Sequence, residues 1–339
     1  MHRHAGETVR NPFESPGFWT RGNLHTHTTN SDGVLPPEKV VDYYSSYGYD
    51  FLALTDHGKL TRIFSEKILL IPGVELVSGR GVLGGDYHVV AVNVEDEEAV
   101  QKHARDSVQT LLDYLKDNGF ALIAHPYWSK LTMQDLLNIT NYLGIEIYNT
   151  GCDVEVAKGF STVHWDNLLT RRVSVYGFAV DDAHWYSNLD APGGWISVKV
   201  REKNLSELIK SIKEGLFYAS TGPAIEKFSH VGNKLEAKFS PSRRIDLVSE
   251  NGTGFSISLD VYNIVRKENT VPKIRIVKTE RNGDEEEVSA EVNSRKVVFK
   301  ISKIGLSHIT LEGFDFKNYV RLEITDANGR KAWTNPIFL

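Results

Sequence analysis

The sequence predicts an α/β domain followed by a smaller all-β domain, and three observations support this division. Up to about Pro223, short apolar runs alternate with longer amphipathic stretches, which is typical of β/α units. After Pro223 the chain consists of short, β-branched and partly alternating segments. A length of 339 residues is enough for two domains. We therefore expect one domain over residues 1–225 and a second over residues 226–339.

Apolar runs in the first domain are predicted to be strands, because buried parallel strands are almost continuously apolar. They cover residues 51–54, 68–77, 121–124, 145–148 and 173–178. Three amphipathic stretches are predicted to be helices, each closed by a glycine and the first with prolines in its first turn. They cover residues 36–47, 97–118 and 204–214.

The second domain is predicted to be a small antiparallel β-sandwich. Its candidate strands are KLEAKF, RIDLV, FSISLDVYN, KIRIVKTE, KVVFKI, HITLEGF and YVRLEIT. The dipeptides Asn251-Gly252, Asn282-Gly283 and Asn328-Gly329 tolerate the positive φ of hairpin turns. Short strands joined by such turns are typical of a β-sandwich.

Composition restricts the partners and the compartment. The net charge of −5 provides no positive field to hold a polyanion, so we do not expect nucleic acid as a partner. A single cysteine, Cys152, leaves no disulfide and favours a reducing compartment. No apolar run approaches the roughly 18 residues that span a bilayer. We expect a soluble, cytoplasmic protein without a membrane partner.

Several apolar runs of the first domain are each followed by a side chain that can bind a metal ion. His25 and His27 flank one residue, so on a strand both imidazoles point to the same face. The remaining members are Asp32, Asp56-His57 after FLALT, Glu75 after ILLIPGV, His125 after ALIA, and Asp182-Ala183-His184 after VSVYGFAVD. In β/α barrels the carboxyl ends of several strands assemble one site.

His88 differs from the other candidates because it opens an apolar run instead of closing one. With it, the set comprises six imidazoles and three carboxylates. That is too many for one tetrahedral zinc and suits two or three ions that share a carboxylate bridge.

These residues resemble the PHP (polymerase and histidinol phosphatase) superfamily of metal-dependent phosphoesterases. The matching motifs, within residues 20–225, are His25-x-His27, Ser31-Asp32-Gly33, Leu54-Thr55-Asp56-His57, Pro72-Gly73-Val74-Glu75, His88, Ala124-His125-Pro126 and Asp182-x-His184. The resemblance implies a distorted (β/α)7 barrel whose strand ends hold two or three Mn, Zn or Fe ions. Segments 218–223 and 333–336 also resemble a branch with a terminal β domain that includes carbaryl and methylcarbamate hydrolases.

The resemblance assigns the ligands to three ions. His25, His27, Glu75 and Asp182 would hold the first, Glu75, His88 and His125 the second, and Asp32, His57 and His184 the third. The spacing favours Asp182 over Asp181, and Asp56 would then orient an imidazole. Glu146 and Asn149 are either supporting or substrate contacts, or they cap the next segment.

The predicted function is a metal-dependent phosphoesterase acting on a small phosphorylated metabolite or nucleotide. A metal-bound hydroxide would be the nucleophile, with His25, Glu75, Asp182 and His184 as catalytic residues. An amide or carbamate hydrolase and an exonuclease-type phosphodiesterase are the alternatives, and the acidic net charge counts against the latter. Cys152 has no nearby base in sequence and receives little catalytic weight.

Cations on the same loops are candidates for binding the substrate's phosphate. They are Lys59, Arg62 and Lys130, with Arg21 as a further candidate, although taken individually each is more often a solvated surface charge, because most Lys and Arg side chains are exposed. Tyr127 and Trp128 either form an apolar wall for the leaving group or pack between loop and helix. The β domain is interpreted as structural support that covers the barrel or mediates a homo-oligomer, with a binding module as the alternative.

Overall fold

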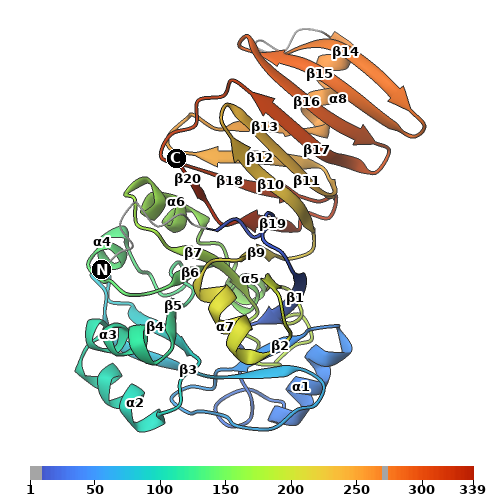
Figure 1. Ribbon diagram of the computed structural model, residues 1–339. Coiled ribbons are helices and arrows are strands. Elements are labelled where there is room, and N and C mark those ends of the chain that lie inside the picture. Colours follow the sequence, from blue (N-terminus) through green and yellow to red (C-terminus); the bar gives the residue numbers. More distant parts are fainter. Residues whose placement is uncertain (1–9, 269–273) are drawn as a thin grey trace. The chain divides into compact units, whose positions relative to one another are not determined.

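The first part of the chain, up to residue 219, forms a mixed α/β unit (Figure 1). The computed structural model describes residues 10–268 and 274–339. The strands of this unit are β1 (Phe18–Asn23), β2 (Phe51–Leu54), β3 (Leu69–Arg80), β4 (Asp86–Val92), β5 (Phe120–Ile123), β6 (Gly144–Asn149), β7 (Tyr176–Val180), β8 (Trp195–Val200) and β9 (Phe217–Ser220). Its helices are α1 (Pro37–Ser46), α2 (Glu97–Asp106), α3 (Val108–Asn118), α4 (Met133–Leu137), α5 (Thr150–Val156), α6 (Thr162–Thr170) and α7 (Leu205–Lys213).

The strands of this unit lie in the order β9-β8-β1-β2-β3-β4-β5-β6-β7. The pairs β1–β2, β2–β3, β5–β6 and β6–β7 are parallel, whereas β4 runs antiparallel to both β3 and β5. Beyond the strand ends, the amide of Asp182 donates to the carbonyl of His25 at 2.8 Å, and that of His27 donates to Ala183 at 2.9 Å. These bonds join the segment after β7 to the segment after β1.

Burial of the apolar runs explains why they form the sheet. All residues of β2, β5 and β7 are buried, as expected for strands covered on both faces. Helix α1 packs on β2, α2 on β3 and α3 on β5, on the outside of the sheet (Figure 1). The mixed α/β architecture expected from the sequence is therefore confirmed.

The prediction of a single helix over residues 97–118 is wrong, because the segment forms two helices. Ser107 has an extended backbone and divides the segment into α2 and α3. Its side chain accepts a hydrogen bond from the amide of Thr110, which caps the N-terminus of α3. A serine that satisfies a free backbone amide stabilises this break.

The second unit, residues 220–339, contains two antiparallel sheets. Its strands are β10 (Ile225–Val231), β11 (Lys234–Ser242), β12 (Arg244–Ser249), β13 (Phe255–Ser258), β14 (Ile274–Asn282), β15 (Glu285–Val292), β16 (Arg295–Ser302), β17 (Gly305–Glu312), β18 (Tyr319–Thr325), β19 (Lys331–Thr334) and β20 (Ile337–Phe338). One sheet has the order β10-β11-β17-β16-β15-β14, and the other contains β13-β12-β18-β19, with β20 paired to β18.

The segment FSISLDVYN is not one strand, as the sequence suggested. Strand β13 ends at Ser258, and helix α8 (Leu259–Glu268) begins at the next residue. Tyr262 and Val265, three residues apart on this helix, are both buried, which gives α8 an apolar face. Among the helices of the described ranges, none is long and apolar enough to cross a lipid bilayer.

Candidate metal centre

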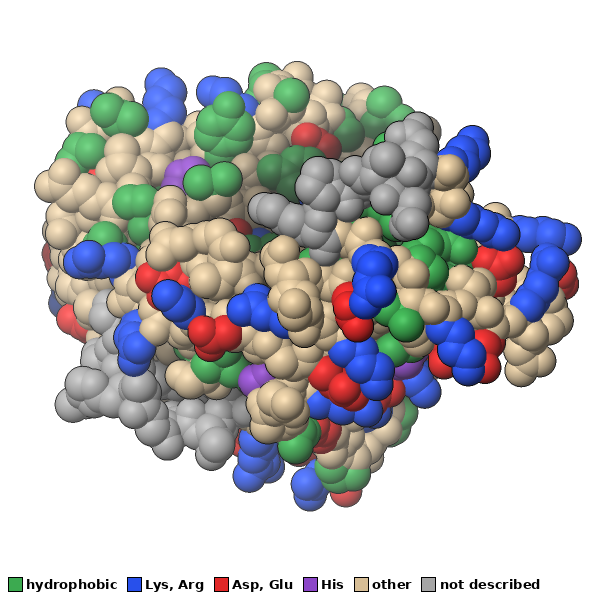
Figure 2. Space-filling model, turned by 90° about the horizontal axis from the view of Figure 1, so that it is seen from above, with side chains coloured by type: hydrophobic (Ala, Val, Ile, Leu, Met, Phe, Trp, Pro, Cys, Tyr) green, Lys and Arg blue, Asp and Glu red, His purple; other side chains and the backbone are tan. Residues whose placement is uncertain are grey.

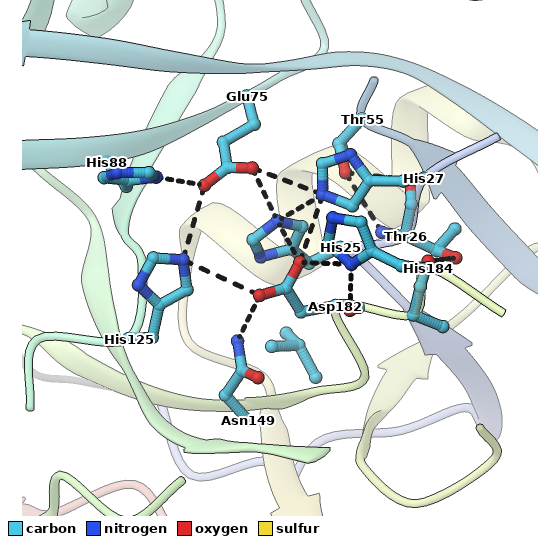
Figure 3. A network of polar contacts seen from close by, with 12 residues as sticks. His25, Thr26, His27, Thr55, Glu75, His88, His125, Asn149, Asp182 and His184 are labelled. Atoms are coloured by element: carbon cyan, nitrogen blue, oxygen red, sulfur yellow. Dashed lines mark hydrogen bonds and ion pairs between the residues drawn. The ribbon is translucent and has the colours of Figure 1, made fainter. Parts of the chain in front are cut away.

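Nine ligand-type side chains from seven separate segments meet at one edge of the sheet. Figure 3 labels His25, His27, Glu75, His88, His125, Asp182 and His184 among them. One group of ligand atoms within 4.8 Å of one another joins His125 and Asp182 to the buried Cys152, and three further overlapping groups of this size consist of the nine residues alone. These three groups are His25, His27, Glu75 and Asp182; Glu75, His88 and His125; and His27, Asp32, His57 and His184. All nine residues named from the sequence are therefore close together.

The direction of β4 explains how His88 reaches this edge. His125 and Asp182 follow β5 and β7, so they lie where those strands end. Because β4 is antiparallel to β5, its beginning lies beside the end of β5, and the carbonyl of His88 accepts a hydrogen bond from Ala124 at 2.9 Å. His88, near the beginning of the antiparallel strand β4, therefore lies at the same edge of the sheet as His125 and Asp182, which follow the ends of β5 and β7.

Glu75, 1% exposed, lies at the centre of the cluster. Its Oε2 lies 3.2 Å from Nε2 of His25, 3.2 Å from Nε2 of His27 and 3.1 Å from Nδ1 of His57. Its Oε1 lies 2.9 Å from Nδ1 of His88 and 3.4 Å from Nε2 of His125. One carboxylate thus faces five imidazoles, which is the position of a group that bridges cations.

Asp182 is the second buried carboxylate. Its Oδ1 lies 3.1 Å from Nε2 of His25 and 3.1 Å from Nε2 of His27, and its Oδ2 lies 3.6 Å from Nε2 of His125. Its backbone has a φ of 53°, in the left-handed region that non-glycine residues rarely adopt. Such backbone strain persists where the surrounding structure holds it, and it concentrates at functional sites.

The third group is more open to solvent. Asp32 Oδ2 lies 3.5 Å from Nε2 of His57, and its Oδ1 lies 3.5 Å from Nε2 of His184. The Asp32 side chain is 48% exposed and that of His57 is 35% exposed, whereas those of His25 and His27 are fully buried. The third group therefore lies on the solvent side of the other two.

Hydrogen bonds outside the cluster fix the tautomers of several imidazoles. Nδ1 of His25 lies 2.6 Å from Glu146, and Nδ1 of His184 lies 3.0 Å from the carbonyl of Asp182. Carboxylate and carbonyl oxygens accept hydrogen bonds, so both Nδ1 atoms carry a proton, and both Nε2 atoms are the ones that face the cluster. Metal-ligating histidines are oriented by outer partners of this kind.

The spacing of the donor atoms also fits a cation. The Nε2 atoms of His25 and His27 are 3.2 Å apart, and each lies 3.1 to 3.2 Å from oxygens of Glu75 and Asp182. Ligands placed 2.0 to 2.1 Å from a tetrahedral zinc would be about 3.4 Å apart. The first group therefore matches the size of a metal site.

Charge and burial oppose each other at these side chains. Burial disfavours the imidazolium of His25, but the carboxylates of Asp182 and Glu146 outweigh it and raise its pKa. Against the same burial, hydrogen bonds to Asp182 and Glu75 raise the pKa of His27 to about 9. Burial opposes ionisation of Glu75, yet the facing imidazoles, His25 above all, hold its pKa well below the ordinary range. The metal-free site therefore retains protons that a bound cation would displace.

Glu146 and Asn149 both support the cluster. Oε2 of Glu146 accepts hydrogen bonds from the amide of His125 at 2.8 Å and from Nδ2 of Asn149 at 2.9 Å. Asn149 also donates to Asp182 at 3.1 Å, and its Oδ1 caps α5 by accepting from the amide of Cys152. The supporting and capping roles, which the sequence left as alternatives, are thus combined in Asn149.

Contrary to the sequence-based expectation, the side chain of Asp56 forms no hydrogen bond with an imidazole of the described residues. It accepts hydrogen bonds from the amide of Thr28 at 2.7 Å and from the hydroxyls of Thr28 and Ser31 at 2.8 and 2.9 Å. Ser31 in turn lies 3.4 Å from Nδ1 of His27. Asp56 therefore acts on His27 through the loop that follows it.

Asp181 points away from the cluster and holds the neighbouring backbone. It accepts hydrogen bonds from the amides of Gly193 and Gly194 at 2.7 and 2.6 Å and from the hydroxyl of Tyr44 at 2.8 Å. Burial raises its pKa to about 6. The choice of Asp182 over Asp181 for the metal cluster thus agrees with the geometry.

The three expected phosphate-binding cations lie on exposed parts of the loops. Arg62 forms an ion pair of 2.8 Å with Glu95, so its charge is already matched. Lys59 and Lys130 have exposed side chains. Arg21 lies between rings, 4.2 Å from the centre of Tyr49 and 3.6 Å from that of Trp195, where cation–π contacts give it a structural role.

Some supporting residues were missed in the sequence. Oδ2 of Asp190 accepts hydrogen bonds from the amides of His184 and Trp185 at 3.0 and 2.7 Å, and the hydroxyl of Ser129 lies 3.0 Å from Nδ1 of His125. Ser129 follows His125 by four residues, a spacing that one turn could have suggested. Asp190 belongs to an irregular loop, in which no periodic signal marks it.

Comparison with known proteins gives partial similarities. No family model matches the chain. A 5'-3' exoribonuclease of Haemophilus influenzae is 36% identical over 83 residues, which are 22% of this chain and 28% of that protein. The chain thus spans little more than a quarter of the length of this curated relative.

Solved structures of three bacterial proteins are similar to the chain. A two-domain protein of Bacteroides vulgatus containing a predicted PHP-like metal-dependent phosphoesterase has a TM-score of 0.49 and 13% identity, covering 91% of each chain. An amidohydrolase of Chromobacterium violaceum has a TM-score of 0.40 and 14% identity, covering 58% of this chain and 96% of its own. A protein of Bifidobacterium adolescentis, proposed to be a metal-dependent phosphoesterase, has a TM-score of 0.41 and 13% identity, covering 57% and 96%.

Proposed function

We propose that this protein is a PHP-type metal-dependent hydrolase that cleaves a small phosphoester. The observation that carries the proposal is the cluster of six imidazoles and three carboxylates, in which His25, His27, Glu75, His125 and Asp182 are buried and the Nε2 atoms of His25 and His184 face the shared centre. So many buried polar groups are costly without a charge to compensate them. We further infer that β1–β7 form the distorted (β/α)7 barrel of that superfamily.

The ligand groups correspond to three divalent cations. His25, His27, Glu75 and Asp182 would hold the first cation, and Glu75 would share the second with His88 and His125. Asp32, His57 and His184 would hold the third, near the solvent. Manganese, zinc and iron all accept imidazole and carboxylate ligands, so the donor set does not choose between them.

Bound cations would lower the pKa of a coordinated water, which supplies a nucleophile at neutral pH, and would stabilise negative charge on the reacting group. The chain's own residues position this chemistry. Glu146 holds the proton of His25 at Nδ1, and the carbonyl of Asp182 holds that of His184. The buried groups exclude bulk water, which strengthens the electrostatic interactions inside the site. The exposed Asp32 side is the face that a substrate can approach.

An amide or carbamate hydrolase is the second candidate function. Arg62 is paired with Glu95, so one of the three expected phosphate contacts has its charge already matched. A carbonyl substrate needs fewer cationic partners than a phosphate does, and the same cation-bound nucleophile attacks a carbonyl carbon.

An exonuclease-type phosphodiesterase is the weaker alternative. The face of the molecule drawn in Figure 2 mixes basic and acidic side chains. Within the described part of the chain, many basic residues are paired with carboxylates, as in the ion pairs Lys67–Asp42 and Arg80–Asp86. A polynucleotide would need a continuous basic groove beside the cluster.

A substrate panel on metal-loaded protein tests the proposal. The protein is purified without added metal, its metal content is measured by mass spectrometry, and it is then assayed with manganese, zinc or iron. We expect release of 4-nitrophenol from 4-nitrophenyl phosphate, lost on chelation and restored by metal. Release from an aryl carbamate alone would favour the second candidate, and degradation of a single-stranded RNA alone would favour the third. Protein that binds none of these metals would overturn the proposal.

A further inference from the structure

Large aromatic side chains are exposed on the loops that carry the metal-ligating residues. Trp128 follows His125 and is 40% exposed, Tyr186 follows His184 and is 63% exposed, and Phe64 is 84% exposed on the loop after His57. Aromatic side chains tend to be buried, so their exposure beside a polar centre calls for a reason.

Trp128 lies directly against two of the candidate ligands. The centre of its ring is 5.1 Å from that of His125 and 5.7 Å from that of His88, with interplanar angles of 71° and 77°. In an edge-to-face arrangement the edge of one ring meets the face of the other. Trp128 therefore lies beside both candidate ligands, and because it is 40% exposed, part of its side chain remains accessible to a substrate.

The backbone around Trp128 is fixed. The amide of Ser129 donates to the carbonyl of His125 at 3.0 Å, and the amide of Leu131 donates to Pro126 at 2.9 Å. Lys130 adopts a left-handed φ of 58° to complete the turn. Because these bonds end on His125 and Pro126, they tie the turn that carries Trp128 to the segment that carries His125.

Tyr186 and Tyr127 are exposed aromatic residues on the same loops, and both have polar partners within the protein. The ring of Tyr186 stacks on His184, and its hydroxyl donates to the carbonyl of Asp32 at 2.6 Å, so it holds the loops of the third group. The ring of Tyr127 has the ammonium of Lys158 at 5.7 Å from its centre. For Trp128, in contrast, the described residues provide ring contacts but no hydrogen bond to the indole.

We propose that Trp128 determines specificity by stacking on a planar aromatic ring in the organic part of the substrate, close to the scissile bond. This inference rests on the proposed phosphoesterase function and adds the class of substrate: esters that carry an aromatic ring. The anionic end of such a substrate would face the cation-binding groups, and the ring would cover the indole. Every base or aryl group offers a π face for such stacking.

A matched pair of substrates distinguishes the effect of the aromatic ring from the effect of phosphoester cleavage. Adenosine 5'-monophosphate and ribose 5-phosphate present the same primary phosphoester and differ in the adenine ring. We expect wild-type protein to have a higher kcat/KM for the nucleotide, and Trp128→Ala to lower the ratio of the two kcat/KM values by roughly 5- to 150-fold, the range that a stacked base contributes. Trp128→Phe should retain most of the ratio, and Tyr127→Ala is the matched control on the neighbouring residue.

The ratio distinguishes stacking from damage to the metal site. A Trp128→Ala protein that had lost metal would be slower on both substrates and would keep the ratio. Equal kcat/KM values in the wild type, or a ratio that Trp128→Ala leaves unchanged, would overturn the inference while leaving the phosphoesterase proposal in place.

Calorimetric binding of the two ligands to metal-loaded protein provides a readout independent of turnover. If neither ester is hydrolysed although 4-nitrophenyl phosphate is, the binding measurement decides about Trp128. Tighter binding of the nucleotide that is lost in Trp128→Ala would then still support the stacking role, and equal binding of both ligands would refute it.

Discussion

Glu146 offers a sharp test of the metal centre because it touches the cluster without belonging to it. The side chain is fully buried, and its two oxygens accept three hydrogen bonds. Oε1 accepts from Nδ1 of His25, and Oε2 accepts from the amide of His125 and from Nδ2 of Asn149. Glu146→Gln keeps the shape and replaces one acceptor by an NH2 group that can only donate.

Neither orientation of the new amide satisfies all partners. If the NH2 group faces His25, that imidazole must accept at Nδ1, so its proton moves to Nε2 and the lone pair that faces the cluster is lost. If the NH2 group faces His125, a buried backbone amide loses its acceptor, which costs about 1 to 3 kcal/mol. We expect metal affinity to fall roughly 10- to 100-fold, as is typical for loss of a partner that orients a ligating histidine.

Metal affinity is measured by competition with a fluorescent chelator at fixed pH, and circular dichroism of the metal-free protein checks the fold. Glu155→Gln, on the exposed part of α5, is the matched control and should bind metal as the wild type does. If Glu146→Gln is folded and binds metal with wild-type affinity, the proposed orientation of His25 is wrong.

Three further outcomes concern protons and packing. Metal binding should release protons near neutral pH, because hydrogen bonds to Asp182 and Glu75 outweigh burial and raise the pKa of His27 to about 9. The apparent affinity for the metal should therefore rise with pH up to about 9. A heat of binding that does not depend on the ionisation enthalpy of the buffer would contradict this. The pKa of Asp181 is raised by burial from 3.8 to about 6, so its contribution to stability is present below its ordinary pKa and is lost as the pH rises through about 6. Relative to Asp181→Asn, the metal-free wild type should therefore lose up to about 3 kcal/mol of unfolding free energy between about pH 4 and pH 7; urea titrations at both ends would refute this if the difference between the two proteins stayed constant. Trp165→Ala should cost roughly 3 to 5 kcal/mol, because the indole is fully buried and donates to the carbonyl of Val175 at 3.0 Å, and an unchanged urea midpoint would disprove it.

Local pattern was sufficient for most of the elements. The run of residues 51–54 is a buried strand, and the prolines and Gly48 mark the two ends of α1. Ser107 and residues 259–268 were misjudged because a capping side chain and a short helix hardly alter hydrophobic periodicity. Both are decided by hydrogen bonds and packing that a periodic pattern does not record.

The sequence alone named the ligand-type residues, since most of the motifs place a residue able to bind a cation at the end of an apolar run. It could not say why His88 belongs with them, because the reversed direction of β4 follows from pairing with its neighbours. Nor could it show that Arg62 pairs with Glu95. It also could not show that Nδ1 of His25 donates a hydrogen bond to Glu146, 121 residues further along the chain. The sequence determines which side chains can bind a cation. The tautomer of each histidine, the pairing of each charge and the exposure of each side chain depend on atoms that only folding brings within a few ångströms.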